Sequence, residues 1–116
     1  KQVYAPGSPA LAQMKAEFAK LGAYAREHDI RVTMAMVPDI HSLADYPLGF
    51  VHDIFAQTAR DNGFAYVDLL PAFRGLTPED IWAMPGDPHP NARGHALMAD
   101  AIYGALAQAR ETEGTR

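Results

Sequence analysis

Two short apolar runs, each closed by a proline, constrain the fold of this chain most strongly. Residues 31–37 and 64–70 are nearly continuous apolar segments that stop at Pro38 and Pro71. Segments of this length with such flanks are typical of strands in parallel sheets, which are buried on both faces. We therefore expect two buried strands that run in the same direction.

Amphipathic helices are expected before and between these strands. Apolar residues recur at spacings of three and four over residues 9–28, which predicts a helix that Ser8 caps and Pro9 starts. The same periodicity over residues 50–62 predicts a second helix, which Gly63 ends. Each helix would then have one apolar face to bury.

A third helix is expected after the second strand. It should start at Asn91, which is a good capping residue, and run to about Arg110. The polar tail over residues 111–116 is expected to fray. Between the second strand and this helix, residues 71–90 are expected to be mostly loop, with a short helical turn after Thr77.

The order helix, strand, helix, strand, helix indicates an α/β fold with a short parallel sheet flanked by helices. Two strands are too few for an independent sheet of this kind, so further strands are expected from another segment or a second chain. Val3 and Tyr4 are candidates for the end of one such strand. Because the chain starts at Lys1 and not at Met, we expect a processed or truncated piece. If strands were removed from its N-terminal side, residues 1–116 are the C-terminal portion of a larger domain. The portion should pair with its missing half or self-associate through the sheet.

Composition excludes several classes of function. Hydrophobic residues make up 48% of the chain, which is enough for a packed core, and the net charge is −4. The basic residues are dispersed, which argues against binding to nucleic acid. No apolar run approaches the ~20 residues of a membrane span. Because cysteine is absent, the chain has neither disulfides nor thiolate metal sites.

The segment from Asp87 to Asn91 is the strongest candidate for a catalytic site. Asp87 and His89 stand two residues apart, and in an extended backbone such side chains point the same way. Pro88 and Pro90 favour the extended backbone and stiffen it, while Asn91 joins the segment to a helix. The pattern predicts a carboxylate that orients an imidazole; a surface loop that satisfies its own backbone is the alternative.

Such a pair can assist a hydroxyl nucleophile. The imidazole takes a proton from the hydroxyl, and the carboxylate fixes the tautomer and stabilises the imidazolium. The chain has two serines. Ser8 fits a helix cap, and Ser42 lacks the glycines of a nucleophile turn and any evident oxyanion donors. The nucleophile is therefore expected to come from outside this stretch of polypeptide.

The sequence Gly-Asp-Pro-His-Pro-Asn-Ala-Arg-Gly-His over residues 86–95 resembles the last block of the SGNH (GDSL) hydrolases. Residues 66–70 and 37–39 are similar to the ends of that family's last two strands. The resemblance implies a flavodoxin-like three-layer fold and a lipase-like serine esterase that needs no cofactor. By residue, it implies His89 as the general base and Asp87 as its orienter. The substrate would be a small ester or an acetylated glycan, and the compartment periplasmic or extracellular.

The chain departs from the family pattern at its most important blocks. The nucleophile block Gly-Asp-Ser is absent, and so are the two blocks that complete the oxyanion hole. In the family all three precede the region that this chain resembles. Without them we expect the chain to have no serine-esterase activity of its own.

Other residues are weaker candidates. Asp68 lies in an apolar strand and is expected to bond a backbone or loop donor, because a buried carboxylate needs partners. His28 and His52 lie on helices and are expected to be solvated. Asp39 and His41 could line the substrate cleft or belong to a solvated loop, and Trp82 could cover the site or fill the core. Candidate substrate-binding residues are Asp39, His41, Ser42, Trp82 and Asn91.

Two other functions remain open from the sequence. A family member without the nucleophile could serve as a non-catalytic module that binds a glycan or a protein partner. Alternatively, Asp87 and His89 could hold a metal with His95 and with Asp39 or His41, since imidazole and carboxylate suit zinc. His95 falls one turn into the helix, so a role in packing or in the helix start fits it better, and no metal is expected.

Overall fold

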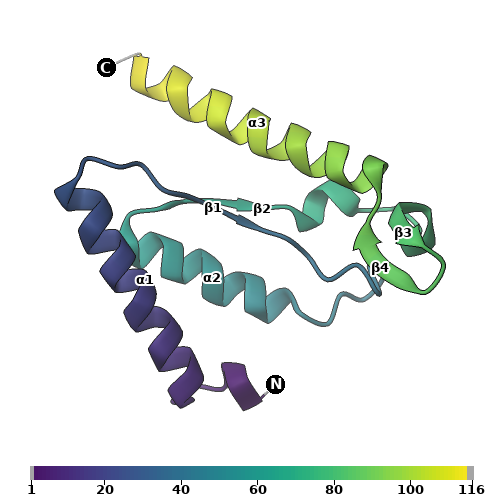
Figure 1. Cartoon of the computed structure of the whole chain (residues 1–116), viewed down its shortest axis with the longest axis horizontal. Coiled ribbons are helices and arrows are strands. Elements are labelled where there is room, and N and C mark those ends of the chain that lie inside the picture. Colours follow the sequence, from purple (N-terminus) through teal and green to yellow (C-terminus); the bar gives the residue numbers. More distant parts are fainter. Residues whose placement is uncertain (1, 115–116) are drawn as a thin grey trace. The chain divides into compact units, whose positions relative to one another are not determined.

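The computed structural model describes residues 2–114, which form an α/β chain of two compact units. The first unit combines the residues up to Met34 with Gly49–Tyr66. The second unit combines Ala35–Leu48 with the chain from Val67 onward. Figure 1 shows the elements in chain order. No helix in the described part is long and apolar enough to cross a membrane.

The first unit contains the two predicted N-terminal helices. Helix α1 (Pro9–Glu27) lies against helix α2 (Gly49–Asn62), and the rings of Phe18 and Phe55 meet edge to face with centroids 6.1 Å apart. Gly22 allows this close approach, because a Cβ there would lie 3.0 Å from Asn62 Oδ1. The periodicity of apolar residues therefore predicted both helices correctly.

Two expectations about the N-terminal segment are wrong. Ser8 occupies the capping position of α1, but its hydroxyl makes no capping hydrogen bond. Proline at the first helical position leaves one fewer amide to cap. Val3 and Tyr4 do not end a strand; they belong to the 3-10 helix η1 (Gln2–Tyr4), and the Tyr4 ring packs edge to face on Phe50.

Strands β1 (Thr33–Met36) and β2 (Ala65–Asp68) form the predicted parallel pair. Ala65 N–H donates to the Val32 carbonyl at 3.0 Å, and Leu69 N–H donates to the Met36 carbonyl at 3.1 Å. Because the acceptor advances along β1 as the donor advances along β2, the two strands run in the same direction.

The expectation that these strands are buried on both faces is wrong for the described chain. Along β1, exposed residues alternate with half-buried ones, and β2 is exposed at its first residue and half-buried beyond it. Val37, just beyond β1, is 50% exposed. An alternating pattern is typical of a sheet with one face open.

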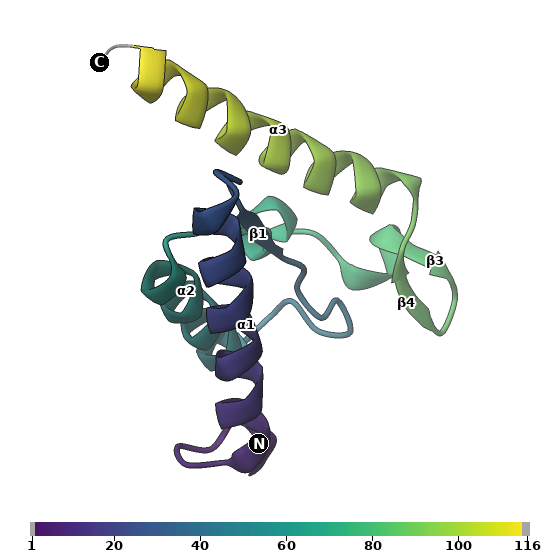
Figure 2. The same cartoon turned by 60° about the vertical axis from the view of Figure 1, so that its left-hand side comes forward.

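In the second unit, the expectation that residues 71–90 are mostly loop is wrong. After the 3-10 helices η2 (Leu70–Phe73) and η3 (Pro78–Ile81), strands β3 (Trp82–Met84) and β4 (Asp87–Pro90) form an antiparallel hairpin. Both Figure 1 and Figure 2 show β4 leading directly into α3. The helical turn after Thr77 is confirmed as η3.

The hairpin was missed because prolines disfavour a strand assignment. Pro88 and Pro90 lie within β4, and proline lacks the N–H that a strand interior normally donates. The turn signal was nevertheless present, because Pro85 and Gly86 connect the strands and Gly86 has a φ of 81°. Proline followed by a left-handed glycine fits a type II turn.

Helix α3 (Ala92–Gly114) starts where the sequence predicts. The Asn91 side-chain oxygen accepts the Gly94 N–H at 3.1 Å, which confirms Asn91 as the cap. The helix continues beyond Arg110 to Gly114, and the expected fraying of the tail stays a prediction; residues 115 and 116 lie outside the described part.

The core of the second unit lies beneath η2, η3 and the first turns of α3. Gly94 belongs to this contact, because a Cβ there would lie 3.0 Å from Pro90 Cβ and 3.7 Å from the Phe73 ring. Gly94 thus allows the hairpin to approach the helix. The buried apolar residues are Ile40, Leu69, Phe73, Ile81 and Met98.

Candidate functional site

Asp87 and His89 form a hydrogen-bonded pair on β4. The Asp87 carboxylate oxygen Oδ1 accepts the backbone N–H of His89 at 3.1 Å and is also bonded to the ring nitrogen Nδ1 of His89. An ionised carboxylate can only accept, so Nδ1 carries the proton and Nε2 is left as a base. The predicted contact between the two side chains is therefore present.

The imidazole favours the ionised form of its partner. The bond from the His89 ring, followed by the bond from the His89 backbone, holds the pKa of Asp87 below its ordinary value of 3.8. Asp87 is therefore a carboxylate at neutral pH, as an orienting residue must be. The His89 side chain is 84% exposed, so its Nε2 edge is open to a donor that approaches from outside.

Asn91 holds the pair against the rest of the unit. Its backbone N–H donates to the Ile81 carbonyl at 2.8 Å, and its side-chain amide donates to the Asp80 carbonyl at 3.0 Å. The side-chain oxygen is occupied by the α3 cap. The structure thus assigns Asn91 to positioning the hairpin, whereas the sequence suggested contact with substrate.

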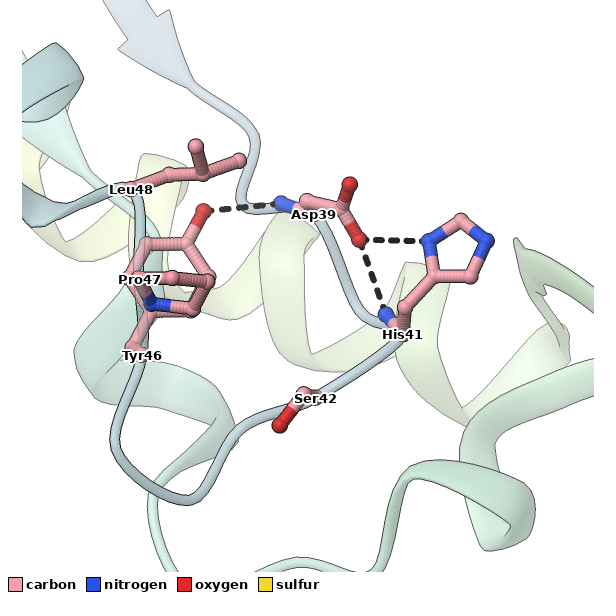
Figure 3. Close-up of a pocket in the computed structure, with 6 residues that line it drawn as sticks. All are labelled: Asp39, His41, Ser42, Tyr46, Pro47 and Leu48. Carbon is pink, nitrogen blue, oxygen red and sulfur yellow. Dashed lines mark hydrogen bonds and ion pairs between the residues drawn. The ribbon is translucent and has the colours of Figure 1, made fainter. Parts of the chain in front are cut away.

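Asp39 and His41 form a second pair of the same kind, in the loop after β1. The Asp39 oxygen Oδ1 accepts the His41 backbone N–H at 2.9 Å and the His41 Nδ1–H at 2.6 Å, as Figure 3 shows. The backbone bond from His41 is the largest cause that lowers the pKa of Asp39. The sequence analysis placed both residues in a cleft or a solvated loop and did not predict their contact, although their Asp-x-His spacing repeats that of Asp87 and His89.

A tyrosine anchors this second pair. The Tyr46 hydroxyl accepts the Asp39 N–H at 2.9 Å. Burial is the largest cause that raises the pKa of Tyr46; the hydrogen bond from the Asp39 backbone opposes it, and the negative charges of Asp39 and Asp68 add to it, so the phenol stays protonated at neutral pH. Asp68, at the end of β2, accepts the Leu70 N–H at 2.9 Å, which confirms the expected backbone partner.

A hollow of about 140 Å³ opens beside this pair. Figure 3 shows the Tyr46 and Pro47 rings and the Leu48 side chain on one side of it and the Asp39/His41 pair on the other. The Ser42 hydroxyl donates to the Ala44 carbonyl at 3.1 Å and points away from the His41 ring. Within residues 2–114, Ser42 contacts neither His41 nor His89 through a hydrogen bond, so its geometry does not fit an activated nucleophile.

Trp82 connects the two pairs. It lies opposite Pro90 in the hairpin, and its indole N–H donates to the carbonyl of Ile40, the residue between Asp39 and His41, at 2.9 Å. The half-buried Trp82 also packs on the core of the unit. Trp82 therefore packs against the core and also links the loop that carries Asp39 and His41 to the hairpin that carries Asp87 and His89.

The remaining histidines lie elsewhere. His95 is exposed in the first turns of α3, where its backbone N–H donates to Asn91 O at 2.9 Å. His28 is exposed and stacks on Tyr24 with ring centroids 3.9 Å apart. His52 is only 4% exposed, so the expectation that it is solvated is wrong. In the described chain, no three His, Asp or Glu residues are grouped to hold a metal ion.

Comparison of the chain with protein-family models, with curated proteins and with solved structures found no match. The site is therefore defined by its own geometry: two carboxylate-bound imidazoles, at the end of β1 and on β4, joined through Trp82.

Proposed function

We propose that this chain is the acid–base portion of a serine ester hydrolase of the SGNH type. The observation that carries the proposal is the exposed His89 imidazole, which is bound through Nδ1 to Asp87 and stands directly before a capped helix. The resemblance of residues 86–95 to the last block of that family supports the same reading. The proposed substrate is a small ester or an acetylated glycan.

The mechanism follows from the free Nε2 atom of His89. A serine hydroxyl, supplied by another segment or chain, gives its proton to Nε2 as its oxygen attacks the ester carbonyl. The ionised Asp87 stabilises the imidazolium. His89 then returns the proton to the departing alcohol, and water hydrolyses the acyl-serine by the same route.

The open sheet supports the proposal that further chain completes the domain. Parallel sheets are normally covered on both faces, whereas alternate residues of β1 are exposed. Strands and helices from the serine-bearing segment would cover them and give the flavodoxin-like three-layer fold of the family. The same segment would supply the oxyanion-hole donors.

A labelling experiment tests whether the nucleophile lies outside the chain. A serine-reactive fluorophosphonate should leave the 116-residue chain unlabelled, because neither of its serines is activated by an imidazole. The protein that also carries the serine-bearing segment should be labelled at one serine of that segment. Labelling at Ser8 or Ser42 would contradict the proposal, and no labelling of the longer protein would favour a non-catalytic binding module.

Replacement of His89 tests its role as the base. In the longer protein, His89→Ala should lower kcat for a short aryl ester by a factor of about 10²–10⁴. His95→Ala is the matched control, because it removes an exposed histidine from the adjacent helix and should leave kcat unchanged. Equal turnover by His89→Ala and the unmodified protein would rule out His89 as the general base.

A further inference from the structure

Helix α3 has a second apolar stripe on the side away from the core, which we call the outer seam. The helix packs on the core of the second unit through Leu97, Met98 and Ile102. The outer seam consists of exposed residues that recur at alternating spacings of four and three: Ala92, Ala96, Ala99, Tyr103 and Leu106. This spacing is the a/d heptad pattern along which two helices pair. A helix side that faces only solvent normally carries polar residues instead.

Tyr103 and Leu106 are the two large side chains of the outer seam. Tyr103 is 75% exposed and Leu106 is 42% exposed. The alanines that precede them present only methyl groups, and small side chains permit a short distance between helix axes. The seam therefore offers a partner helix two large side chains and, beside them, a shallow surface.

Charged residues at the margin of the outer seam determine which helix fits it. Arg110 continues the heptad spacing, Asp100 borders the middle of the seam, and Arg93 borders it near the start of α3; all three are exposed. In the described chain, neither Asp100 nor Arg110 forms an ion pair. Both charges are thus available to a partner.

A second copy of α3 in antiparallel orientation complements these charges. When Tyr103 of one copy lies opposite Leu106 of the other, two-fold symmetry also places Leu106 of the first copy opposite Tyr103 of the second. In the same register Arg110 lies opposite Ala99 and next to Asp100 of the other copy. Two identical ion pairs then flank the large side chains.

Other arrangements of the same two helices bring like charges together or lose the ion pairs. In a parallel pair, residues at the same heptad position face each other, so Arg110 would face its own equivalent. A shift of the antiparallel register by one heptad would set Arg110 opposite Ala92 and beside Arg93. The opposite shift separates Asp100 from Arg110 and shortens the overlap. Charge therefore selects one orientation and one register.

We propose that α3 pairs with α3 of a second copy of this chain, antiparallel and through the outer seam, with Tyr103 on Leu106 and Arg110 on Asp100. The seam is shorter than the roughly three to four heptads of a stable coiled coil, so the pair is weak and depends on concentration. The inference is independent of the proposed function, because the seam contains none of the residues assigned to catalysis.

Cross-linking through single cysteines tests the orientation. The natural chain has no cysteine, so a short bismaleimide joins only the cysteine that is introduced. At about 1.5 Å per residue, the proposed register sets the two copies of position 106 about 5 Å apart along the helix axis and those of position 96 about 26 Å apart. Leu106→Cys should therefore form cross-linked dimers, and Ala96→Cys should not. Equal cross-linking of the two variants would overturn the antiparallel pairing.

Two controls separate the outer seam from other contacts between copies. Gln108→Cys is exposed on the same turns of α3 but lies off the seam, so it reports random collision. If it cross-linked as fast as Leu106→Cys, the seam would have no role. Cross-linking of Leu106→Cys should persist when Val37→Lys is added, and its loss there would assign the contact to the sheet instead of α3.

Charge reversal in the Leu106→Cys background tests the ion pairs. Asp100→Arg sets two positive side chains together and Arg110→Asp sets two negative ones together, so each variant alone should cross-link about fivefold more slowly. In an equimolar mixture of the two, both contacts again join opposite charges, and cross-linking should recover. Asp53→Arg, the same reversal at an exposed position of α2, is the control and should change nothing. No recovery in the mixture would refute the contact between Arg110 and Asp100.

Discussion

The indole N–H of Trp82 donates to the carbonyl oxygen of Ile40 at 2.9 Å, across 42 residues of sequence. Ile40 is 2% exposed, so water cannot readily replace this donor. One hydrogen bond thus links the hairpin that carries Asp87 and His89 to the loop that carries Asp39 and His41.

Loss of this bond should destabilise the chain. Trp82→Phe keeps an aromatic ring but leaves the Ile40 carbonyl without its indole donor, and an unsatisfied buried acceptor costs about 1–3 kcal/mol. Urea unfolding followed by circular dichroism should show this loss. Tyr103→Phe, a change at an exposed ring on α3, is the control and should leave the midpoint unchanged. Equal midpoints for both variants would show that the bond contributes nothing.

The two carboxylates should respond differently to removal of their histidine rings. The His89 ring is the main cause that lowers the pKa of Asp87, whereas the His41 backbone is the main cause at Asp39. His89→Ala should therefore raise the pKa of Asp87 further than His41→Ala raises that of Asp39. Carboxyl ¹³C NMR titrations measure both values, and a larger rise at Asp39 would contradict the assignment of causes.

The same pKa values predict how acid affects the pairs. Both carboxylates have folded-state pKa values below 3.8, so their contribution to stability is complete above that pH and is lost as pH falls through the lowered values. The bonds within each pair should persist at pH 4.5 and break below 3.8. Disappearance of the His41 and His89 amide protection already at pH 5 would contradict this order.

Two glycines of α3 should respond oppositely to alanine. Gly94→Ala places a Cβ 3.0 Å from Pro90 Cβ, which forces the hairpin away from the helix and should destabilise the chain by about 1–3 kcal/mol. Gly104→Ala is the matched control, because nothing lies within 4 Å of its Cβ, and it should stabilise the helix by up to about 1 kcal/mol. Thermal unfolding should show a lower midpoint temperature for Gly94→Ala and a higher one for Gly104→Ala.

The open sheet should promote association of the chain. Because alternate residues of β1 and the adjoining Val37 are exposed, we expect concentration-dependent dimers by size-exclusion chromatography with light scattering. Val37→Lys should shift the population toward monomer. Gln13→Lys adds the same charge on the exposed side of α1 and should not. A monomer at every concentration would argue against association through the sheet.

The sequence predicted the elements whose signals are local. Apolar periodicity and terminal glycine, proline and asparagine residues identify α1, α2 and the start of α3 within a few residues. The parallel direction of β1 and β2 follows from the helix between them. Their burial was not predictable, because it depends on what covers the sheet, and a strand sequence does not specify that.

In the candidate site too, the contacts encoded by local sequence were predictable and those that depend on tertiary packing were not. The contact between Asp87 and His89 was predictable, because two prolines keep the intervening backbone extended. The equivalent contact between Asp39 and His41 was missed, since Pro38 precedes that pair and no proline separates its members. Two residues outside the pair hold its loop: Tyr46 accepts the Asp39 N–H, and Trp82 donates to the Ile40 carbonyl. These contacts depend on the conformation of the loop and on tertiary packing, which no local sequence pattern encodes.

The two prolines of β4 have a consequence for association as well as for geometry. Pro88 and Pro90 offer no backbone N–H, and the N–H of His89 is already taken by the Asp87 carboxylate. A strand from another molecule would therefore find almost no backbone N–H donors with which to pair along the β4 edge. The two prolines and the Asp87–His89 hydrogen bond therefore disfavour the addition of another strand at the β4 edge, and they leave the His89 imidazole exposed.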